Sequence, residues 1–331
     1  MNMERETVIK ESAKFAPIIR EYDKDLLDEI EGIAEGSQLR PEEIIALNCR
    51  YELVWGKLGD TRKPTHSAPS GARECTTVGI SPEATVNGHT FVAGNWDYKP
   101  KVRENCIIVE EIQEPAKPNI VIHTEAGIVG QKGMNSDGIG VAPNALMCTK
   151  DKYEPATPFF LTLRGALNER TLDRAMLAVS KAERCVSGNI MMGQAGGVVD
   201  LETSPDDVQF LFGEEGIVSH ANNFVNSPNL VDKSKYVWPD SFIRTERADS
   251  LLRKHVGEIG PDTIKATLKD HFSYPNSICG HPDTHYPLDF QSETITSIVM
   301  DLDSRVIRMT NGQPCRSPYK TYEFSSLKAR N

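Results

Sequence analysis

The chain has 331 residues, of which 39% are hydrophobic and 25% are charged, a composition typical of globular proteins that form one large domain or two. Its formal net charge of −10 argues against a nucleic-acid surface, because phosphate binding needs clustered Lys and Arg. No run of about 18 apolar residues is present, so we expect no membrane span.

The N-terminal part of the chain is predicted to be helical. Residues 4–35 carry apolar side chains at helical spacings among Lys and Glu. Pro41 begins a second helix that extends to about Leu53, since proline is accommodated in a first turn. Residues 57–73 contain two Pro, two Gly and several small polar residues, which predicts a loop or linker.

From Cys75 onward the pattern changes to short β-rich runs, with a helical block at 157–186 that is predicted to form two helices. The predicted strands are 75–80, 90–94, 106–113, 119–124, 137–144, 189–193, 197–202, 208–212, 216–220, 294–300 and 304–309. The Gly-rich strings 130–133 and 193–197 lack the Lys-Ser/Thr of a phosphate loop and are interpreted as hairpin turns. Consecutive strands between helical blocks indicate an α+β fold with antiparallel sheets.

The cysteine pattern favours a reducing, cytoplasmic location. Seven cysteines are scattered without a Cys-x-x-Cys pair, which predicts neither a zinc ribbon nor a disulfide framework. The charged start of the chain does not resemble a secretory signal, and its last three residues are not a Ser-Lys-Leu peroxisomal address. His281 and His285 have the spacing of a helical metal pair, but Pro282 disfavours a helix there, so no metal site is expected.

Cys75, followed at a distance by Asn95-Trp96-Asp97, is the most informative residue. The pattern fits a chain that cuts its own Glu74–Cys75 bond and so gives Cys75 a free α-amine beside its thiol. An α-amine titrates near pH 7.7–8.0, so one residue can supply both nucleophile and base. A lone cysteine is more often an inert buried residue, and the interpretation therefore depends on the surrounding motifs.

Those motifs continue in order along most of the chain, at 46–53, 75–77, 94–97, 124–130, 133–139, 144–146, 220–223, 274–279 and 294–299. The series resembles the acyl-coenzyme A:isopenicillin N acyltransferase family, a branch of the N-terminal-nucleophile hydrolases. The resemblance implies a four-layer αββα sandwich. It also implies one domain made of a helical segment and linker, 1–74, and a catalytic segment, 75–331, which stay together after cleavage.

Roles for individual residues come partly from spacing and partly from the resemblance. Thr77 shares a strand face with Cys75, so its hydroxyl is expected to position the thiol or to take part in the self-cleavage, the alternative being an ordinary strand side chain. Asp97 is expected to hold the new amine and tune its protonation, the alternative being a turn residue. The family's oxyanion asparagine matches Asn222, and the second donor is then a main-chain N–H near Asp97. The alternatives are the neighbouring Asn223 and an ordinary Asx turn. The resemblance implies that 126–146 lines the pocket, and the predicted pocket residues are Trp96, Glu125, Asn144 and Gln291.

Three departures from the family affect the prediction. Glu74 replaces the usual Gly before the nucleophile, which predicts slow or conditional self-cleavage. Gly280 and Gln291 replace arginines, so the leaving group is expected to be neutral or cationic and not a carboxylate of the penicillin type.

The sequence thus predicts a self-processing N-terminal-cysteine amidohydrolase that cleaves a small acyl-amide through a Cys75 thioester. Its expected partners are that substrate and its own cleaved N-terminal fragment, with no cofactor and coenzyme A thioesters only as substrates. One alternative is an acyltransferase that moves an acyl group from acyl-CoA or an amide to an amine. The others are an uncleaved binding protein and a cysteine hydrolase with His123 or His220 as its base.

Overall fold

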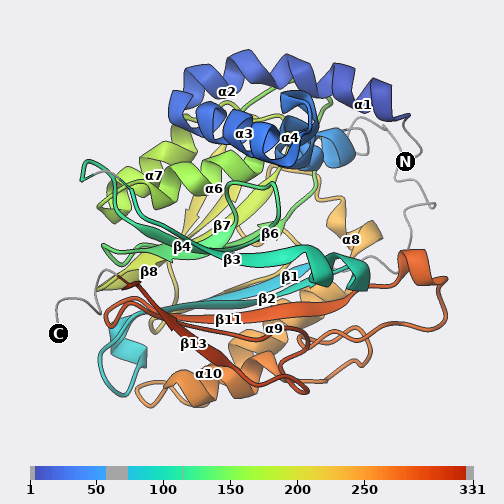
Figure 1. Ribbon diagram of the computed structural model, residues 1–331. Coiled ribbons are helices and arrows are strands. Elements are labelled where there is room, and N and C mark those ends of the chain that lie inside the picture. The colour runs from blue at the N-terminus through green and yellow to red at the C-terminus, as the bar shows by residue number, and fades with distance from the viewer. Residues whose placement is uncertain (1–3, 57–73, 114, 326–331) are drawn as a thin grey trace.

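Two stacked antiparallel sheets carry the fold in the computed structural model, which describes residues 4–56, 74–113 and 115–325 (Figure 1). The six-stranded sheet contains, in spatial order, β10 (Ile217–His220), β1 (Cys75–Ile80), β2 (Phe91–Tyr98), β11 (Glu293–Asp301), β12 (Val306–Met309) and β13 (Lys320–Glu323). The seven-stranded sheet contains β3 (Cys106–Glu111), β4 (Ile120–Glu125), β5 (Lys132–Asn135), β6 (Gly140–Ala145), β7 (Gly188–Gln194), β8 (Gly197–Thr203) and β9 (Val208–Leu211).

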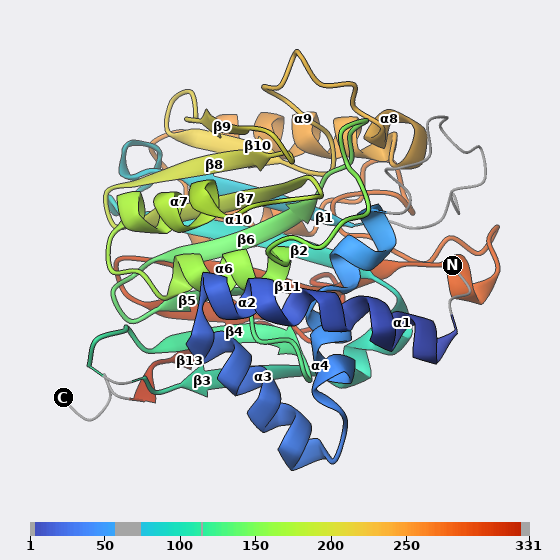
Figure 2. The same cartoon turned by 90° about the horizontal axis from the view of Figure 1, so that it is seen from above.

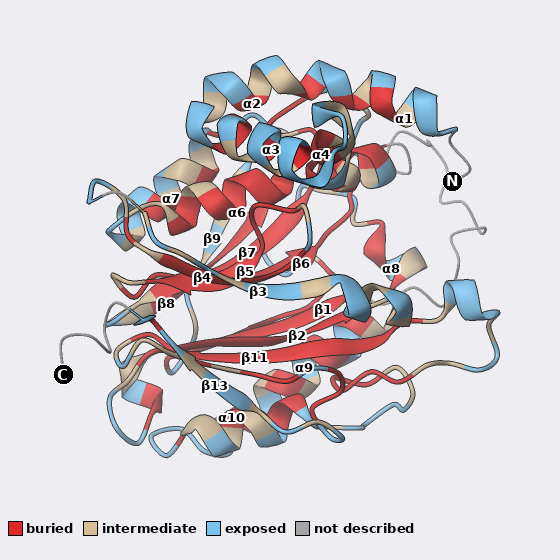
Figure 3. Cartoon of the chain, in the orientation of Figure 1, coloured by how far each residue is buried: buried red, intermediate tan, exposed pale blue. Residues whose placement is uncertain are grey.

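Helices cover the outer face of each sheet, which confirms the predicted four-layer α+β sandwich (Figure 1). Helices α6 (Phe159–Leu167) and α7 (Leu172–Lys181) pack on the seven-stranded sheet, and α9 (Asp240–Arg253) and α10 (Pro261–Leu268) pack on the six-stranded sheet. A short helix, α8 (Ser234–Val237), precedes α9. The central strands are buried because both of their faces are covered (Figure 3).

The N-terminal helices form a further layer above α6 (Figures 1 and 2). They are α1 (Arg5–Ser12), α2 (Ala16–Tyr22), α3 (Lys24–Ser37) and α4 (Pro41–Asn48), followed by a π-helical turn at Glu52–Gly56. The helix predicted over 4–35 is broken at Asp23, which has extended backbone dihedrals and accepts a hydrogen bond from Asp25 N at 2.9 Å. Asp23 thereby caps α3. Short 3-10 turns lie at Ala13–Phe15, Pro82–Ala84, Pro100–Asn105 and Leu288–Phe290.

The predicted strands are confirmed with shifted ends, and several elements were missed. The string 130–133 is not a turn, because β5 begins at Lys132 and pairs with β4 and β6. The second Gly-rich string is a turn, with Gly196 at a φ of 108° between β7 and β8. Strand β13 and helices α8 to α10 were not predicted. The predicted linker at 57–73 lies outside the described residues, and within the described ranges no helix is long and apolar enough to span a membrane.

Candidate active site

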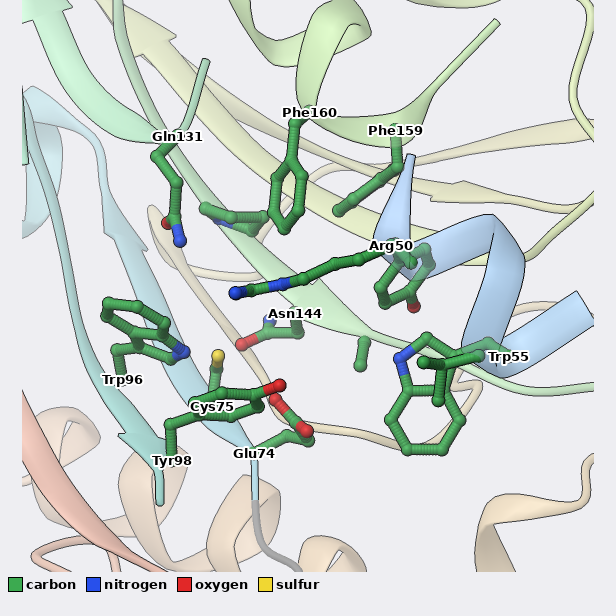
Figure 4. A pocket seen from close by; sticks show the side chains of 14 residues that line it. Arg50, Trp55, Glu74, Cys75, Trp96, Tyr98, Gln131, Asn144, Phe159 and Phe160 are labelled. Carbon is green, nitrogen blue, oxygen red and sulfur yellow. The ribbon is translucent and has the colours of Figure 1, made fainter. Parts of the chain in front are cut away.

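Cys75 opens β1 at the wall of a cavity of about 70 Å³ between the two sheets (Figure 4). Alternation along the strand directs Cys75 and Thr77 toward the seven-stranded sheet, whereas Val78 on the opposite face packs with the core under α9 and α10. The cavity is lined by Arg50, Tyr51, Val54, Trp55, Glu74, Cys75, Trp96, Tyr98, Gln131, Pro143, Asn144, Ala145, Phe159 and Phe160. The Cys75 thiol therefore faces a cavity that is lined largely by aromatic side chains.

The backbone on both sides of Cys75 is held by hydrogen bonds. Asp97 N donates to the carbonyl oxygen of Glu74 at 3.1 Å, so a main-chain N–H already polarises the carbonyl of the Glu74–Cys75 bond. Buried Arg244, from α9, donates to the Cys75 carbonyl at 2.6 Å and to Thr76 Oγ1 at 2.8 Å. The Asp97 carboxyl accepts from Thr294 Oγ1 at 2.5 Å. These hydrogen bonds therefore fix the backbone on both sides of the Glu74–Cys75 bond.

Burial dominates the electrostatics of the cavity. It raises the pKa of the Cys75 thiol well above its usual range, and the neighbouring Glu74 carboxyl adds to this while Lys132 opposes it. Burial also raises the pKa of Glu74 to about 8, against the attraction of Arg50, and lowers the pKa of Lys132 to about 8. At neutral pH the thiol of the uncleaved chain is therefore protonated.

Lys132 is a buried cation beside the nucleophile. Its Nζ lies 3.7 Å from the ring centroid of Trp96, the cross-strand partner of Cys75 in β2, and donates to Gln131 Oε1 at 2.6 Å. The Lys132 ammonium acts to lower the thiol pKa, and Cys75 acts in return to keep Lys132 protonated. Because the pKa of Lys132 is near 8, it exchanges a proton close to physiological pH.

Neither of the two histidines proposed as a conventional base lines the cavity. His123 lies at the edge of Trp96, with ring centroids 6.0 Å apart, and burial lowers its pKa to about 3. His220 is fully buried, with Nε2 2.9 Å from Glu202 Oε1. Burial alone would lower its pKa, but Asp200 and Glu202 outweigh that effect and raise it to about 9. His220 is thus a buried imidazolium held by carboxylates.

A buried chain of amides connects Thr77 to these carboxylates. Asn144 Nδ2 donates to Thr77 Oγ1 and to Asn189 Oδ1, both at 2.6 Å, and Asn189 Nδ2 donates to Asp200 Oδ1 at 2.6 Å. The Asp200 carboxylate can only accept hydrogen bonds, so Asn189 turns its NH₂ group toward it. This leaves Asn189 Oδ1 facing Asn144, which turns its own NH₂ group toward that oxygen. Among the described residues, Asn144 Oδ1 has no hydrogen-bond partner, and it is directed into the cavity (Figure 4).

Asn222 lies behind the cavity wall. Its Nδ2 donates to the carbonyl of Ala145 at 3.0 Å, and its Oδ1 accepts from Arg244 Nη2 at 2.9 Å. Asn223 Oδ1 accepts from Ser241 Oγ at 2.6 Å. Asn222 is therefore linked to Cys75 through Arg244, whose guanidinium donates to the Cys75 carbonyl. The role of Asn222 as an oxyanion donor stays a prediction.

The predicted pocket residues are only partly brought together. Trp96 and Asn144 line the cavity, and Glu125 forms a two-pronged ion pair with Arg50, which also lines it. Gln291 does not line this cavity, since its side chain donates to the Tyr286 carbonyl at 2.8 Å on a separate loop.

Sequence reasoning assigned no role to Arg50, Lys132 or Arg244. Arg50 lies inside a motif of the resemblance and Lys132 lies between two of them, but their charge is typical of exposed positions. Arg244 lies in a helix that was not predicted. The only available signal was a lysine within a Gly-bounded string next to the expected pocket.

A model of the acyl-coenzyme A:6-aminopenicillanic acid acyl-transferase family matches residues 84–316. The chain belongs to this family. A relative from Emericella nidulans, described as the 40 kDa form of acyl-coenzyme A:6-aminopenicillanic-acid-acyltransferase, is 29% identical over 334 residues, covering 97% of this chain and 87% of the relative. The predicted family resemblance is thereby confirmed.

Solved structures add a likeness of fold. A Caenorhabditis elegans ortholog of N-acylethanolamine-hydrolyzing acid amidase is 15% identical with a TM-score of 0.50, over 69% of this chain and 93% of that one. Penicillin V acylase from Agrobacterium tumefaciens gives a TM-score of 0.48 at 14% identity, over 72% and 83%. The likeness to the amidase, together with the two stacked sheets and the helices that cover them, identifies the fold of this acyl-transferase family member as the N-terminal-nucleophile hydrolase fold.

Proposed function

We propose that this protein is a self-processing N-terminal-cysteine amidohydrolase that cleaves a small acyl-amide through a thioester on Cys75. The observation that carries the proposal is the junction at Cys75. Its thiol lies in a cavity lined by aromatic rings, and the preceding carbonyl, that of Glu74, accepts the Asp97 N–H at 3.1 Å. A nucleophile and an oxyanion donor thus meet at one peptide bond.

This geometry supports the proposed self-processing. The Cys75 sulfur attacks the Glu74 carbonyl carbon, the C–N bond breaks, and the nitrogen keeps its hydrogen and gains the thiol proton. The result is a thioester between Glu74 and the Cys75 sulfur, with a free amine on Cys75. Water hydrolyses the thioester, which returns the thiol and leaves a carboxylate at the end of residues 1–74.

The same groups then serve the substrate. The free amine takes the thiol proton, the thiolate attacks the acyl-amide carbonyl, and the amine leaving group departs with that proton. The Asp97 N–H, released from Glu74, donates to the oxyanion, and Asn222 is the second donor suggested by the family. Asn144 Oδ1 offers an acceptor for the amide N–H of the substrate or for the amine of Cys75.

The cavity wall indicates the acyl group. Trp55, Phe159 and Phe160 present apolar surface, and the charge of Arg50 is already paired with Glu125. An apolar acyl chain therefore fits better than a carboxylate. A volume of about 70 Å³ is well below the roughly 300–1,000 Å³ of small-molecule pockets, so departure of the Glu74 side chain has to enlarge the cavity.

Acyl transfer is the second candidate, favoured by the name of the fungal relative. It differs only in that an amine, and not water, resolves the acyl-enzyme. Adding a panel of amines to the hydrolysis reaction separates the two, because in transfer the amine attacks the acyl-enzyme, so a new amide forms in place of the free acid in proportion to amine concentration.

The decisive experiment is the intact mass of the purified protein. We expect two fragments, residues 1–74 and 75–331, and a single whole chain for Cys75→Ala. A Cys106→Ser variant, which removes a partly buried thiol outside the junction, should still be cut. Cleavage of Cys75→Ala at the same bond would contradict autocatalysis, and a wild-type chain that stays whole without activity would favour the binding-protein alternative.

A further inference from the structure

Four side chains that bind soft metals meet away from the cavity, behind β2 and β11. They are His271, Cys279, His281 and Cys315, and their ligand atoms all lie within 4.8 Å of one another. His281 Nε2 lies 3.1 Å from His271 Nε2, 3.5 Å from Cys315 Sγ and 3.8 Å from Cys279 Sγ. Two imidazoles and two thiols thus converge on one point.

These separations match a tetrahedral metal shell. With Zn–S near 2.3 Å and Zn–N near 2.05 Å, tetrahedral angles place ligand atoms about 3.4 Å apart for N–N and about 3.6 Å for S–N. The observed 3.1, 3.5 and 3.8 Å lie within a few tenths of an ångström of those values. Two neutral imidazole nitrogens and two thiolates are a ligand set that selects zinc over calcium or magnesium.

The backbone that carries the ligands is fixed independently of any metal. Asn95, in β2, donates from Nδ2 to the carbonyls of Leu268 and Ile278, both at 2.9 Å, and so pins both ends of the segment between them. Cys279 N donates to the Asp270 carbonyl at 3.0 Å. Cys279 and His281 are buried, while His271 and Cys315 are exposed, which gives an ion a path from solvent.

The segment that carries two of the ligands also contacts Thr294 in β11, which lies next to Asp97. Gly280, between two of the ligands, donates its N–H to Thr294 Oγ1 at 2.8 Å and accepts from Thr294 N at 3.1 Å. Thr294 in turn holds the Asp97 carboxyl. An ion bound here would therefore fix the segment that supports Asp97.

We propose that His271, Cys279, His281 and Cys315 form a structural zinc site. Four protein ligands close the tetrahedral shell and leave no open position for substrate, so the ion stabilises the fold and takes no part in the chemistry. The site differs from the His281 and His285 pair considered from the sequence, because His285 is exposed and bonds Asp283 at 2.7 Å. It does not depend on the proposed function.

Metal content tests the site directly. Full-length protein, purified under reducing conditions, incubated with zinc and then desalted, is expected to retain one zinc ion per chain. The double variant His271→Ala/Cys315→Ser should retain essentially none, and because both positions are exposed, the change opens no core cavity. His285→Ala, an exposed histidine outside the cluster, is the matched control and should retain the full amount.

Cobalt(II) provides a readout of geometry. Cobalt-loaded wild type and His285→Ala should show the intense visible bands of a tetrahedral thiolate site, and the double variant should not. Zinc should also raise the Tm of wild type by several degrees without changing that of the double variant. A wild-type protein without zinc, zinc retained by the double variant, or a Cys279–Cys315 disulfide in the reduced preparation would overturn the proposal.

Discussion

Two ionisable groups beside Cys75, Lys132 and Glu74, are expected to control the proposed self-cleavage. Before cleavage Cys75 has no α-amine, so the base of the mature enzyme does not yet exist. Lys132 lies close enough to favour the thiolate, whereas the carboxylate form of Glu74 disfavours it. The pKa values of Lys132 and Glu74 are both shifted to about 8, by burial in each case, so both change charge over the same pH range.

Lys132 is therefore the group we expect to accept the thiol proton in the uncleaved chain. Lys132→Met should slow self-cleavage by at least about 10²-fold, the usual contribution of a positioned general base. The rate of wild-type self-cleavage should rise as Lys132 loses its own proton near pH 8, because only the neutral Lys132 amine can accept the thiol proton. The rate can be followed by intact mass over time after cell-free synthesis.

Lys132→Arg separates the base from its charge. Arginine keeps the positive charge that favours the thiolate but does not lose its proton at accessible pH. If Lys132 is the base, the arginine variant should be nearly as slow as the methionine variant. Wild-type speed in Lys132→Arg would show that only the charge matters.

Glu74 is expected to make self-cleavage conditional on pH. Below about pH 8 its carboxyl is protonated, so Glu74→Gln should cleave like wild type. Above that pH the wild-type carboxylate raises the thiol pKa, so the variant should be faster, by up to about tenfold for a shift of one pKa unit. The ratio of the two rates across pH 6.5 to about 9.5 measures this. Glu104→Gln, at an exposed position, should give a flat ratio, and a flat ratio for Glu74→Gln would remove the residue from the control of cleavage.

At the scale of elements, the strands β1, β6, β7, β8 and β10 share the polar network that ends at His220. His220→Gln leaves Asp200 and Glu202 buried without their positive partner, which should cost about 3–5 kcal/mol of unfolding free energy. The folded pKa of His220 is raised to about 9, so its contribution is fully present below the unfolded pKa of about 6.5 and lost as pH rises through about 9. The difference between wild type and variant should therefore shrink in alkaline buffer.

Urea unfolding of both proteins in the Cys75→Ala background measures this effect on an uncut chain. His255→Gln, at an exposed histidine, should change the free energy by no more than about 0.5 kcal/mol. An equally small loss for His220→Gln would mean that the carboxylates are neutral or are paired elsewhere.

The strands were predictable where their own residues determine them, and the missed elements show where tertiary context decides. Strand β5 was taken for a turn because a Gly-bounded lysine is normally exposed, yet Lys132 is buried against Trp96. Helix α9 lacks an apolar stripe because its inward face carries Ser241, Arg244 and Thr245. Those polar side chains hold β1 and the loop after β10, which sequence periodicity alone does not reveal.

The site was predictable to a similar degree. Motif order placed Cys75 and Asp97 near each other, and the structure brings them together because adjacent antiparallel strands set Cys75 opposite Trp96. Their roles as nucleophile and main-chain donor stay predictions. Gln291 was assigned to the pocket through an alignment with a family arginine, but its loop leads the side chain elsewhere. The cluster of two histidines and two cysteines was missed because Cys315 lies far along the chain from His271, Cys279 and His281.

At the scale of the whole molecule, the segment before the proposed scissile bond helps to line the candidate active site. Arg50, Tyr51 and Trp55 line the cavity although they precede the cut. Asn48 donates to the Gly127 carbonyl at 2.8 Å and accepts from Val129 N at 3.0 Å, so its side chain stabilises the turn after β4. Glu52 Oε1 accepts from Phe159 N at 2.6 Å. Helices α1 to α4 have an apolar core of their own that also includes Val129 and Leu161.

We therefore expect the fragments 1–74 and 75–331 to remain one particle after cleavage. They should co-elute in native size-exclusion chromatography and separate only in denaturant. Tyr51 is one link between the fragments, because its hydroxyl donates to the Ser187 carbonyl at 2.8 Å and its ring stacks on Phe159, with centroids 4.9 Å apart. Tyr51→Ala should cost about 3–5 kcal/mol and lower the denaturant midpoint for release of the small fragment.

Val54→Ala, which trims a more exposed side chain at the same cavity, should leave that midpoint nearly unchanged. Because the small fragment supplies Arg50, Tyr51 and Trp55, its release should abolish acyl-amide hydrolysis and re-addition should restore it. A large fragment that stays folded and fully active after the small one is washed away would contradict this, since it would place the working acyl pocket entirely within residues 75–331.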